Sequence, residues 1–133
     1  RWPRGSWSWL RICGTMQFIM EAEGFWHKLD ELVRSCPVKI DRPRGSSHPR
    51  HGVRYPLDYG YLQATQAADG GGIDVWVGSL PHGQVTGVVC TIDVYKRDAE
   101  IKILLGCTSQ ESHQIAAFHN AGAQAAVLVE RPH

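Results

Sequence analysis

The apolar residues of the first third of the chain follow a helical period. Between residues 22 and 35 they recur every three or four positions, which predicts an amphipathic helix. These residues are Ala22, Phe25, Trp26, Leu29, Leu32 and Val33. The positive charge of Arg34 near the end of the segment interacts favourably with the helix dipole, and Pro37 ends the helix. We expect one face of this helix to cover a core.

After Pro37 the pattern changes to short β-branched runs separated by Gly, Pro and Asp clusters. Such runs are typical of strands. We predict strands at residues 38–41, 60–64, 73–77, 85–94 and 99–105. Their short length and close spacing favour a small antiparallel barrel over a parallel sheet with crossover helices.

A second helix is predicted after residue 107. Thr108 and Glu111 have the spacing of a capping box, and Gly122 is a typical helix stop. The apolar residues of this helix are Ile115, Ala116 and Phe118. His119 is expected to be a surface or capping residue, and residues 125–129 are predicted to add a last strand.

Composition indicates one folded domain. The chain has 133 residues, 43% of them hydrophobic and 20% charged, with a net charge of +1. This charge gives no general attraction to nucleic acid or to an anionic membrane, and no apolar run approaches the ~20 residues of a membrane span. The four cysteines are widely spaced without a C-x-x-C pair. They favour reduced thiols and a cytoplasmic protein.

Residues 1–15 differ from the rest of the chain. They begin with Arg and contain three Trp without a helical or strand period. We interpret residues 1–15 as a non-native or upstream appendage and residues 16–133 as a single domain, with Met16 as the natural start. Apolar surface around this N-terminus could support a homo-oligomer.

Four aspartates between Tyr55 and Lys102 lie where strands meet turns. They are Asp69, Asp74, Asp93 and Asp98. Strand alternation places Asp98, Glu100 and Lys102 on one face, which we expect to be too charged for dry burial. Converging carboxylates would hold a hard cation, Mg²⁺ or alternatively Mn²⁺. Because Asp and Gly are also the usual turn residues, a purely structural role stays open.

Four segments, taken in order, resemble one family. They are IDRPRGS (residues 40–46), YPLDYGYL (55–62), DGGGIDV (69–75) and DVYKRDAEIK (93–102). The chain resembles the soluble family I inorganic pyrophosphatases from about residue 38 to 107. The resemblance implies a mainly β fold, a small OB-like antiparallel β-barrel with flanking N-terminal and C-terminal helices. It also implies Mg²⁺-dependent hydrolysis of pyrophosphate, or of a related small-molecule phosphoanhydride, to phosphate.

The resemblance assigns roles residue by residue. Asp69, Asp74 and Asp98 match carboxylates that bind Mg²⁺ in the family, and Asp74 matches the one that bridges two ions at the catalytic centre. Asp93 matches a ligand of a further ion. Tyr59 matches a tyrosine that hydrogen-bonds phosphate. The implied mechanism neutralises the substrate and activates a water with Mg²⁺.

Several positions depart from the family pattern. Gly71 stands where the family has an aspartate that orients or deprotonates the attacking water. Glu100 replaces a phosphate-binding lysine, although Lys102 lies on the same strand face and is expected to contact phosphate instead. Asp58, beside Tyr59, replaces an Asn and adds a carboxylate that could supply a base. We therefore expect Asp58 to share catalysis with Asp74.

Basic residues gather between residues 44 and 54. They are Arg44, His48, Arg50, His51 and Arg54. Arg44 or Arg54 is predicted to contact phosphate, because arginine suits bidentate phosphate contacts. The alternative is a solvated loop.

The departures leave two further functions open. In the first, the barrel binds a phosphorylated ligand or nucleotide without turnover. In the second, the protein is structural and the acids only form turns.

Overall fold

The computed structural model describes residues 7–133, with side chains described from residue 14 onward. Six strands and two helices follow one another along the chain. They are α1 (Trp7–Ser35), β1 (Val38–Arg42), β2 (Asp58–Leu62), β3 (Ile73–Val77), β4 (Val85–Asp93), β5 (Asp98–Leu105), α2 (Ser109–His119) and β6 (Gln124–Glu130). This arrangement confirms the predicted mainly β class with flanking helices.

The six strands form one sheet in the order β1-β2-β3-β5-β4-β6. Within the described residues the sheet stays open, with β1 and β6 as its edges. Neighbours are antiparallel except β3 and β5, which are parallel, with Val75 opposite Ile103. The sheet therefore differs from the antiparallel barrel expected from the strand spacing. The parallel pair arises because the β4–β5 hairpin places β5, rather than β4, against β3.

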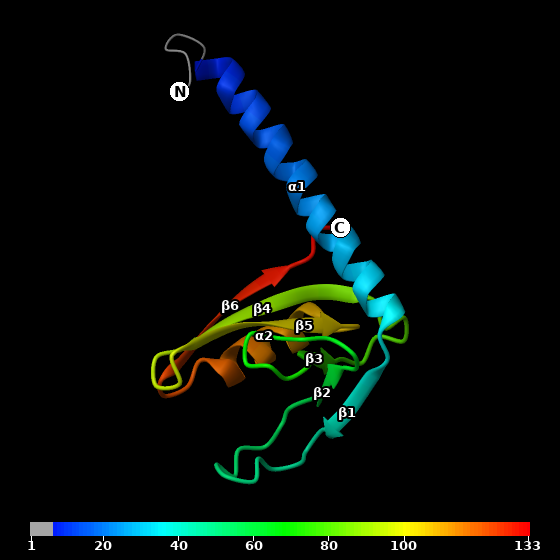
Figure 1. Ribbon diagram of the computed structural model, residues 1–133, viewed down its shortest axis with the longest axis vertical. Coiled ribbons are helices and arrows are strands. Elements are labelled where there is room, and N and C mark those ends of the chain that lie inside the picture. Colours follow the sequence, from blue (N-terminus) through cyan, green and yellow to red (C-terminus); the bar gives the residue numbers. More distant parts are fainter. Residues whose placement is uncertain (1–6) are drawn as a thin grey trace.

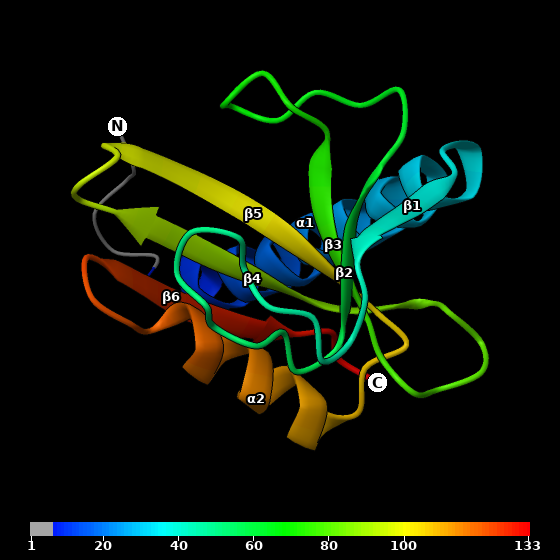
Figure 2. The same cartoon turned by 90° about the horizontal axis from the view of Figure 1, so that it is seen from below.

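Each face of the sheet has its own core and its own helix (Figures 1 and 2). Side chains of a strand alternate between the faces, so successive residues join different cores. The core on the α1 side contains Trp26, Leu62, Val75, Val85, Val88, Ile103 and Leu105. The core on the α2 side contains Tyr55, Leu57, Trp76, Val89, Leu104, Cys107 and Ile115. Val75 and Trp76, which are neighbours along β3, accordingly lie in different cores.

Helix α1 begins at Trp7, well before the predicted start at residue 22. Among the residues whose side chains are described, those of its C-terminal part pack on the sheet, through Trp26, Leu29 and Val33. The N-terminal half leads away from the sheet (Figure 1). Residues 1–6 of the predicted appendage lie outside the described residues, and the division at residue 16 stays a prediction. None of the described helices is long and apolar enough to cross a membrane.

Helix α2 has the predicted capping box. Thr108 Oγ1 accepts a hydrogen bond from the Glu111 backbone N–H at 3.1 Å. In return, Glu111 Oε1 accepts from the Thr108 N–H at 2.8 Å and from the Ser79 N–H at 3.2 Å. The cap thereby joins the start of α2 to the loop after β3.

Candidate functional site

Polar side chains gather on the α2 face of the sheet, where β2, β3 and β5 lie side by side. Tyr59 is opposite Trp76, and Tyr61 is opposite Asp74. The parallel register of β3 and β5 then brings Lys102 level with Asp74. Since strand residues two apart share a face, Glu100 points to the same side as Lys102, as alternation predicted.

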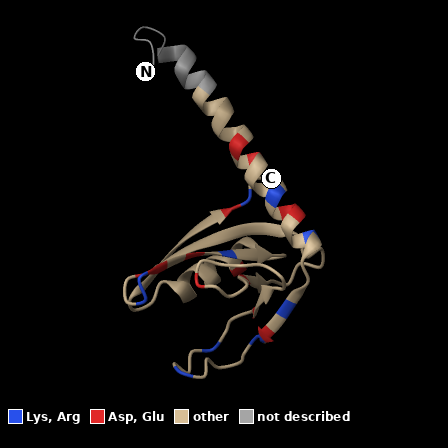
Figure 3. Ribbon diagram, in the orientation of Figure 1, with Lys and Arg blue, Asp and Glu red and all other residues tan. Residues whose placement is uncertain are grey.

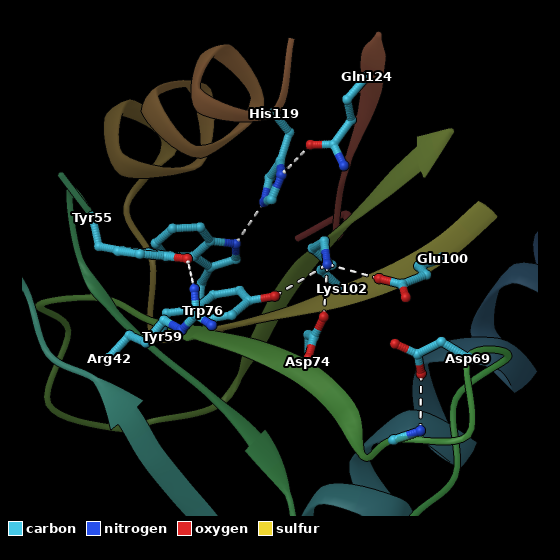
Figure 4. Close-up of polar contacts among 11 residues, drawn as sticks. Arg42, Tyr55, Tyr59, Asp69, Asp74, Trp76, Glu100, Lys102, His119 and Gln124 are labelled. Atoms are coloured by element: carbon cyan, nitrogen blue, oxygen red, sulfur yellow. Dashed lines mark hydrogen bonds and ion pairs between the residues drawn. The ribbon is translucent and has the colours of Figure 1, made fainter. Parts of the chain in front are cut away.

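Lys102 is the centre of this group. Its Nζ donates hydrogen bonds to Asp74 Oδ2 at 2.7 Å, Glu100 Oε2 at 2.9 Å and the Tyr59 hydroxyl oxygen at 3.1 Å (Figure 4). An ammonium group has three donors, and all of them are used. We call Tyr59, Asp74, Glu100 and Lys102 the Lys102 cluster.

Of this charged face only Lys102 is buried, whereas Tyr59, Asp74 and Glu100 keep partial access to solvent. Lys102 is 4% exposed. Its charge is tolerated because two carboxylates neutralise it. The sequence pattern showed the face correctly, but the salt bridge across β3 and β5 depends on a strand pairing that alternation does not reveal.

The cluster holds its groups in defined protonation states. Burial alone would lower the pKa of Lys102, but Tyr59, Asp74 and Glu100 together raise it, so the ammonium stays charged. Burial raises the pKa of Tyr59, which keeps its phenolic proton. Burial also raises the pKa of Glu100. Glu100 is therefore a stronger base than a solvated glutamate.

Asp69 lies beside the cluster in the turn before β3. Its Oδ1 accepts a hydrogen bond from the Gly71 N–H at 3.0 Å, and this bond lowers the pKa of Asp69. Its carboxyl group lies on the Glu100 side of the cluster (Figure 4), and hydrogen bonding with Asp69 adds to the rise in the pKa of Glu100. Two predicted metal ligands, Asp69 and Asp74, thus lie on either side of Glu100.

The other two predicted metal ligands lie elsewhere. Asp93 and Asp98 are opposite each other at the far end of the β4–β5 hairpin. Asp93 Oδ1 accepts from the Tyr95 and Lys96 N–H groups, both at 2.9 Å, which is a turn contact. Asp98 shares the strand face of Glu100 and Lys102, two and four residues away, or roughly 7 and 13 Å along β5. Among the described residues, Asp69, Asp74 and Asp98 do not form a group arranged to hold an ion, and Mg²⁺ binding by Asp98 stays a prediction.

Asp58 lies apart from the cluster as well. It points to the opposite face of β2 from Tyr59, and its Oδ1 accepts from the Arg44 backbone N–H at 2.8 Å. This contact anchors the loop between β1 and β2. Catalysis by Asp58 stays a prediction.

The predicted basic residues lie along the β1–β2 loop (Figure 3). Arg44, Arg50 and Arg54 are exposed there. Arg42, which the sequence did not single out, donates to the Tyr55 hydroxyl, and its guanidinium lies 5.4 Å from the centre of that ring. Tyr55 in turn packs 5.3 Å from the Tyr59 ring. The loop is thus joined to the cluster through aromatic contacts.

His119 is a buried residue that sequence reasoning misplaced. The expectation of a surface or capping position is wrong, because His119 is 5% exposed. Its Nε2 accepts from Trp76 Nε1 at 3.0 Å, and its Nδ1 lies 2.9 Å from Gln124 Oε1 (Figure 4). Burial lowers the pKa of His119 to about 4, so it is neutral at pH 7. Its position four residues after Ile115, on the inward face of α2, is the signal that could have found it.

The carboxylates present fit Mg²⁺ by their donor chemistry. Carboxylate oxygens are hard ligands, and Asp69 is exposed while the Asp74 side chain is 26% exposed. No group of three His, Cys, Asp or Glu residues within the described chain is arranged to hold an ion. However, Mg²⁺ in phosphate sites is held by one or two carboxylates, and phosphate oxygens and water complete its shell. Asp69 and Asp74 meet that smaller requirement.

Comparison with known proteins gives matches only among solved structures. No protein-family model and no curated protein matches the chain. An inorganic phosphatase from Anaplasma phagocytophilum is 17% identical, with a TM-score of 0.49 over 68% of this chain and 80% of that one. For an inorganic pyrophosphatase from Coxiella burnetii the identity is 18% and the TM-score 0.47, over 71% and 77%. For an inorganic pyrophosphatase from Helicobacter pylori they are 14% and 0.46, over 71% and 75%. Similarity at this level does not establish what this chain does.

Proposed function

We propose that this chain hydrolyses inorganic pyrophosphate, or a related phosphoanhydride, to phosphate in the presence of Mg²⁺. The observation that carries the proposal is the Lys102 cluster with Asp69 beside it. A buried ammonium, a protonated phenol and carboxylates that reach solvent lie together on one sheet face. Three of the four segments that resemble the pyrophosphatases supply these side chains.

The residues suit a highly charged phosphate substrate. Asp69 and Asp74 would hold Mg²⁺, which when bound neutralises phosphate oxygens and lowers the pKa of water. Tyr59 keeps a proton that it can donate to a phosphate oxygen. Lys102 fixes the Asp74 carboxylate and adds a positive charge that burial shields from solvent. Arg44 and Arg54, on the nearby loop, are proposed to contact the substrate as it enters.

Two carboxyl groups are proposed as the base that accepts a proton from water. Glu100 is favoured because burial raises its pKa. Asp58 is the second, from the sequence comparison. If Glu100 is the base, its loss of charge on acidification removes activity at a higher pH than for a solvated glutamate. In the pH profile of activity, the variant Glu100→Gln should no longer show this fall on acidification, whereas Asp58→Asn should keep it.

Phosphate release from pyrophosphate by the purified full chain tests the activity. We expect release to need millimolar Mg²⁺ and to fall by ~10²–10⁴ in Asp74→Asn, the range for removing a positioned charged group. The matched control is Asp41→Asn, at an exposed aspartate of β1, which should keep full activity. The proposal fails if the wild-type chain releases phosphate no faster than Asp74→Asn.

Gly71 favours a second function, binding of a phosphorylated ligand without turnover. Residue 71 lies beside Asp69, since a Cβ there would be 3.4 Å from Asp69 Oδ1. Because it is glycine, it supplies no carboxylate at that place. Titration calorimetry with pyrophosphate and Mg²⁺, with phosphate measured in the same samples, separates the two functions. Binding heat without phosphate would support this second function and contradict the first.

A further inference from the structure

An apolar surface lies exposed on the α1 side of the sheet, across β5, β4 and β6. Cys90 on β4 is opposite both Ile101 on β5 and Val127 on β6, so the three side chains form one row. We call the exposed apolar residues of these strands the sheet patch. They are Cys90, Ile92, Ala99, Ile101, Val127 and Val129. Ile92 is 55% exposed and Val127 64%. Contiguous apolar surface of this kind marks an interaction site.

The sheet patch is open because α1 covers only the neighbouring part of the same face. The N-terminal half of the helix leads away from the strands (Figure 1). A groove of about 470 Å³ lies between Phe25 and Leu29 of α1 and the strands. Ile101 and Cys90 line both the groove and the sheet patch, so the two surfaces are continuous.

A second apolar surface lies on α1 itself. The helix face that packs on the sheet at Trp26 continues through Ala22 to Ile19 and Phe18, at spacings of three and four residues. We call the exposed apolar residues of this face the helix patch. They are Met16, Phe18 and Ile19. Residues 14–20 carry no charge.

The geometry points to a second copy of this chain as the occupant of both surfaces. In the proposed homodimer, the helix patch of each copy lies on the sheet patch of the other. A two-fold axis satisfies both contacts at once, because one chain carries both complementary surfaces. The charge pattern agrees, since the groove contains a single charged residue, Glu100, and the helix patch none.

The area is sufficient for a stable dimer. The nine side chains of the helix and sheet patches, each about half exposed, would bury roughly 800 Å² per copy, which is the share of a standard interface. A lipid surface fits less well. Helices that lie on membranes are rich in Lys and Arg, whereas residues 14–27 contain neither and carry Glu21 and Glu23 (Figure 3).

The mass of the full chain in solution tests the dimer. Sedimentation at about 50 µM, far above the Kd of a standard-size interface, should give a dimer. Ile19→Glu on the helix patch and Val127→Lys on the sheet patch should each give a monomer, and the double variant should regain dimer through the new ion pair. The matched control is Tyr95→Glu, at an 88% exposed residue of the β4–β5 turn outside both patches, which should stay dimeric. Circular dichroism checks that each variant folds.

A monomeric wild-type chain, or a dimer that both patch variants leave intact, would overturn the proposal. So would binding to phosphatidylcholine vesicles in place of self-association. Alkylation gives a second readout that needs no destabilising variant. Cys90 is exposed in the single chain. Its reaction with a bulky maleimide should therefore slow at least tenfold as the protein concentration rises from the monomer to the dimer range. Cys36, which lies outside both patches, should react at a constant rate. An unchanged rate at Cys90 would contradict the interface.

Discussion

Lys102 Nζ lies 2.7 Å from Asp74 Oδ2 across the parallel pair of β3 and β5. The ammonium is buried, while the carboxylate keeps partial access to solvent. The pair therefore does two things at once. It neutralises a charge that the sheet face could not otherwise bury, and it fixes the orientation of a carboxylate proposed to hold Mg²⁺.

Lys102→Met should destabilise the fold, because it leaves Asp74 and Glu100 without their shared cation. Removing one partner of a buried ion pair lowers the free energy of unfolding by roughly 3–5 kcal/mol. Urea denaturation at pH 7 measures the loss. The control Lys39→Met removes an exposed lysine of β1 and should change the free energy by less than about 0.5 kcal/mol.

Adding Glu100→Gln to Lys102→Met tests the reason for the loss. The double variant removes one of the two orphaned carboxylates, so it should recover part of the stability, and it keeps the measurement possible if the single variant does not fold. Equal unfolding free energies for Lys102→Met and the wild type would show that the cluster does not stabilise the sheet.

The bond between α1 and the end of β6 gives a second stability prediction. Arg131 donates from Nη1 and Nη2 to the two Asp30 carboxylate oxygens, each at 2.8 Å. This bond lowers the pKa of Asp30. The pair is partly exposed, so Asp30→Asn should cost only about 0.5–1 kcal/mol.

The pH dependence of the Asp30 effect follows from the direction of its shift. A depressed folded-state pKa means that the stabilisation is present above the ordinary aspartate pKa and is lost as the pH falls through the folded value. Unfolding measured at pH 7 and at pH 2 should therefore show a smaller difference between Asp30→Asn and the wild type at pH 2. Glu31→Gln, at an exposed neighbour, is the control. A difference that grows on acidification would contradict this account.

The sequence predicted the secondary structure well because its signals are local. Alternation placed Glu100 and Lys102 on one face of β5, and the Thr108–Glu111 spacing located the start of α2. The β3–β5 pairing joins residues 28 positions apart, Asp74 and Lys102, and no local period reports it.

The candidate site was predicted in part for the same reason. Asp69, Asp74, Tyr59 and Lys102 come together because their segments lie on neighbouring strands. Asp98, which the resemblance grouped with them, lies on the same face of β5 two residues before Glu100, at the start of the strand. The spacing of four residues from Ile115 indicates that His119 faces inward, but its hydrogen bond to Trp76 depends on how α2 packs on the sheet, which no local pattern reports.

Gly71→Asp should strengthen Mg²⁺ binding. Residue 71 has no positive φ, and the atoms nearest to a Cβ there belong to the Asp69 carboxyl group, at 3.4 Å or more, so the side chain fits. The new side chain adds a third carboxylate to those of Asp69 and Asp74. We expect a larger Mg²⁺-dependent rise in Tm than in the wild type, because a ligand that binds the folded state stabilises it. If the proposed hydrolysis holds, phosphate release should rise as well.

Gly71→Asn is the matched control for that prediction. The amide has the same size as the carboxyl group but no charge, so it should leave the Mg²⁺ dependence of Tm unchanged. Equal Mg²⁺ effects in Gly71→Asp, Gly71→Asn and the wild type would show that Asp69 is not part of a cation site.

His119 should make the protein less stable as the pH falls below the ordinary histidine pKa. Burial lowers its pKa from 6.5 to about 4, so between these values the unfolded chain binds a proton that the folded chain excludes. The stability is fully present above pH 6.5, falls by roughly 3 kcal/mol as the pH approaches 4, and changes little further below it. His119→Gln cannot take up this proton, so its unfolding free energy should depend less on pH between 6.5 and 4. His113→Gln, at an exposed histidine of the same helix, should keep the wild-type slope. Urea denaturation at pH 7 and pH 4.5 measures both. Parallel pH profiles for His119→Gln and the wild type would mean that burial does not hold the imidazole neutral.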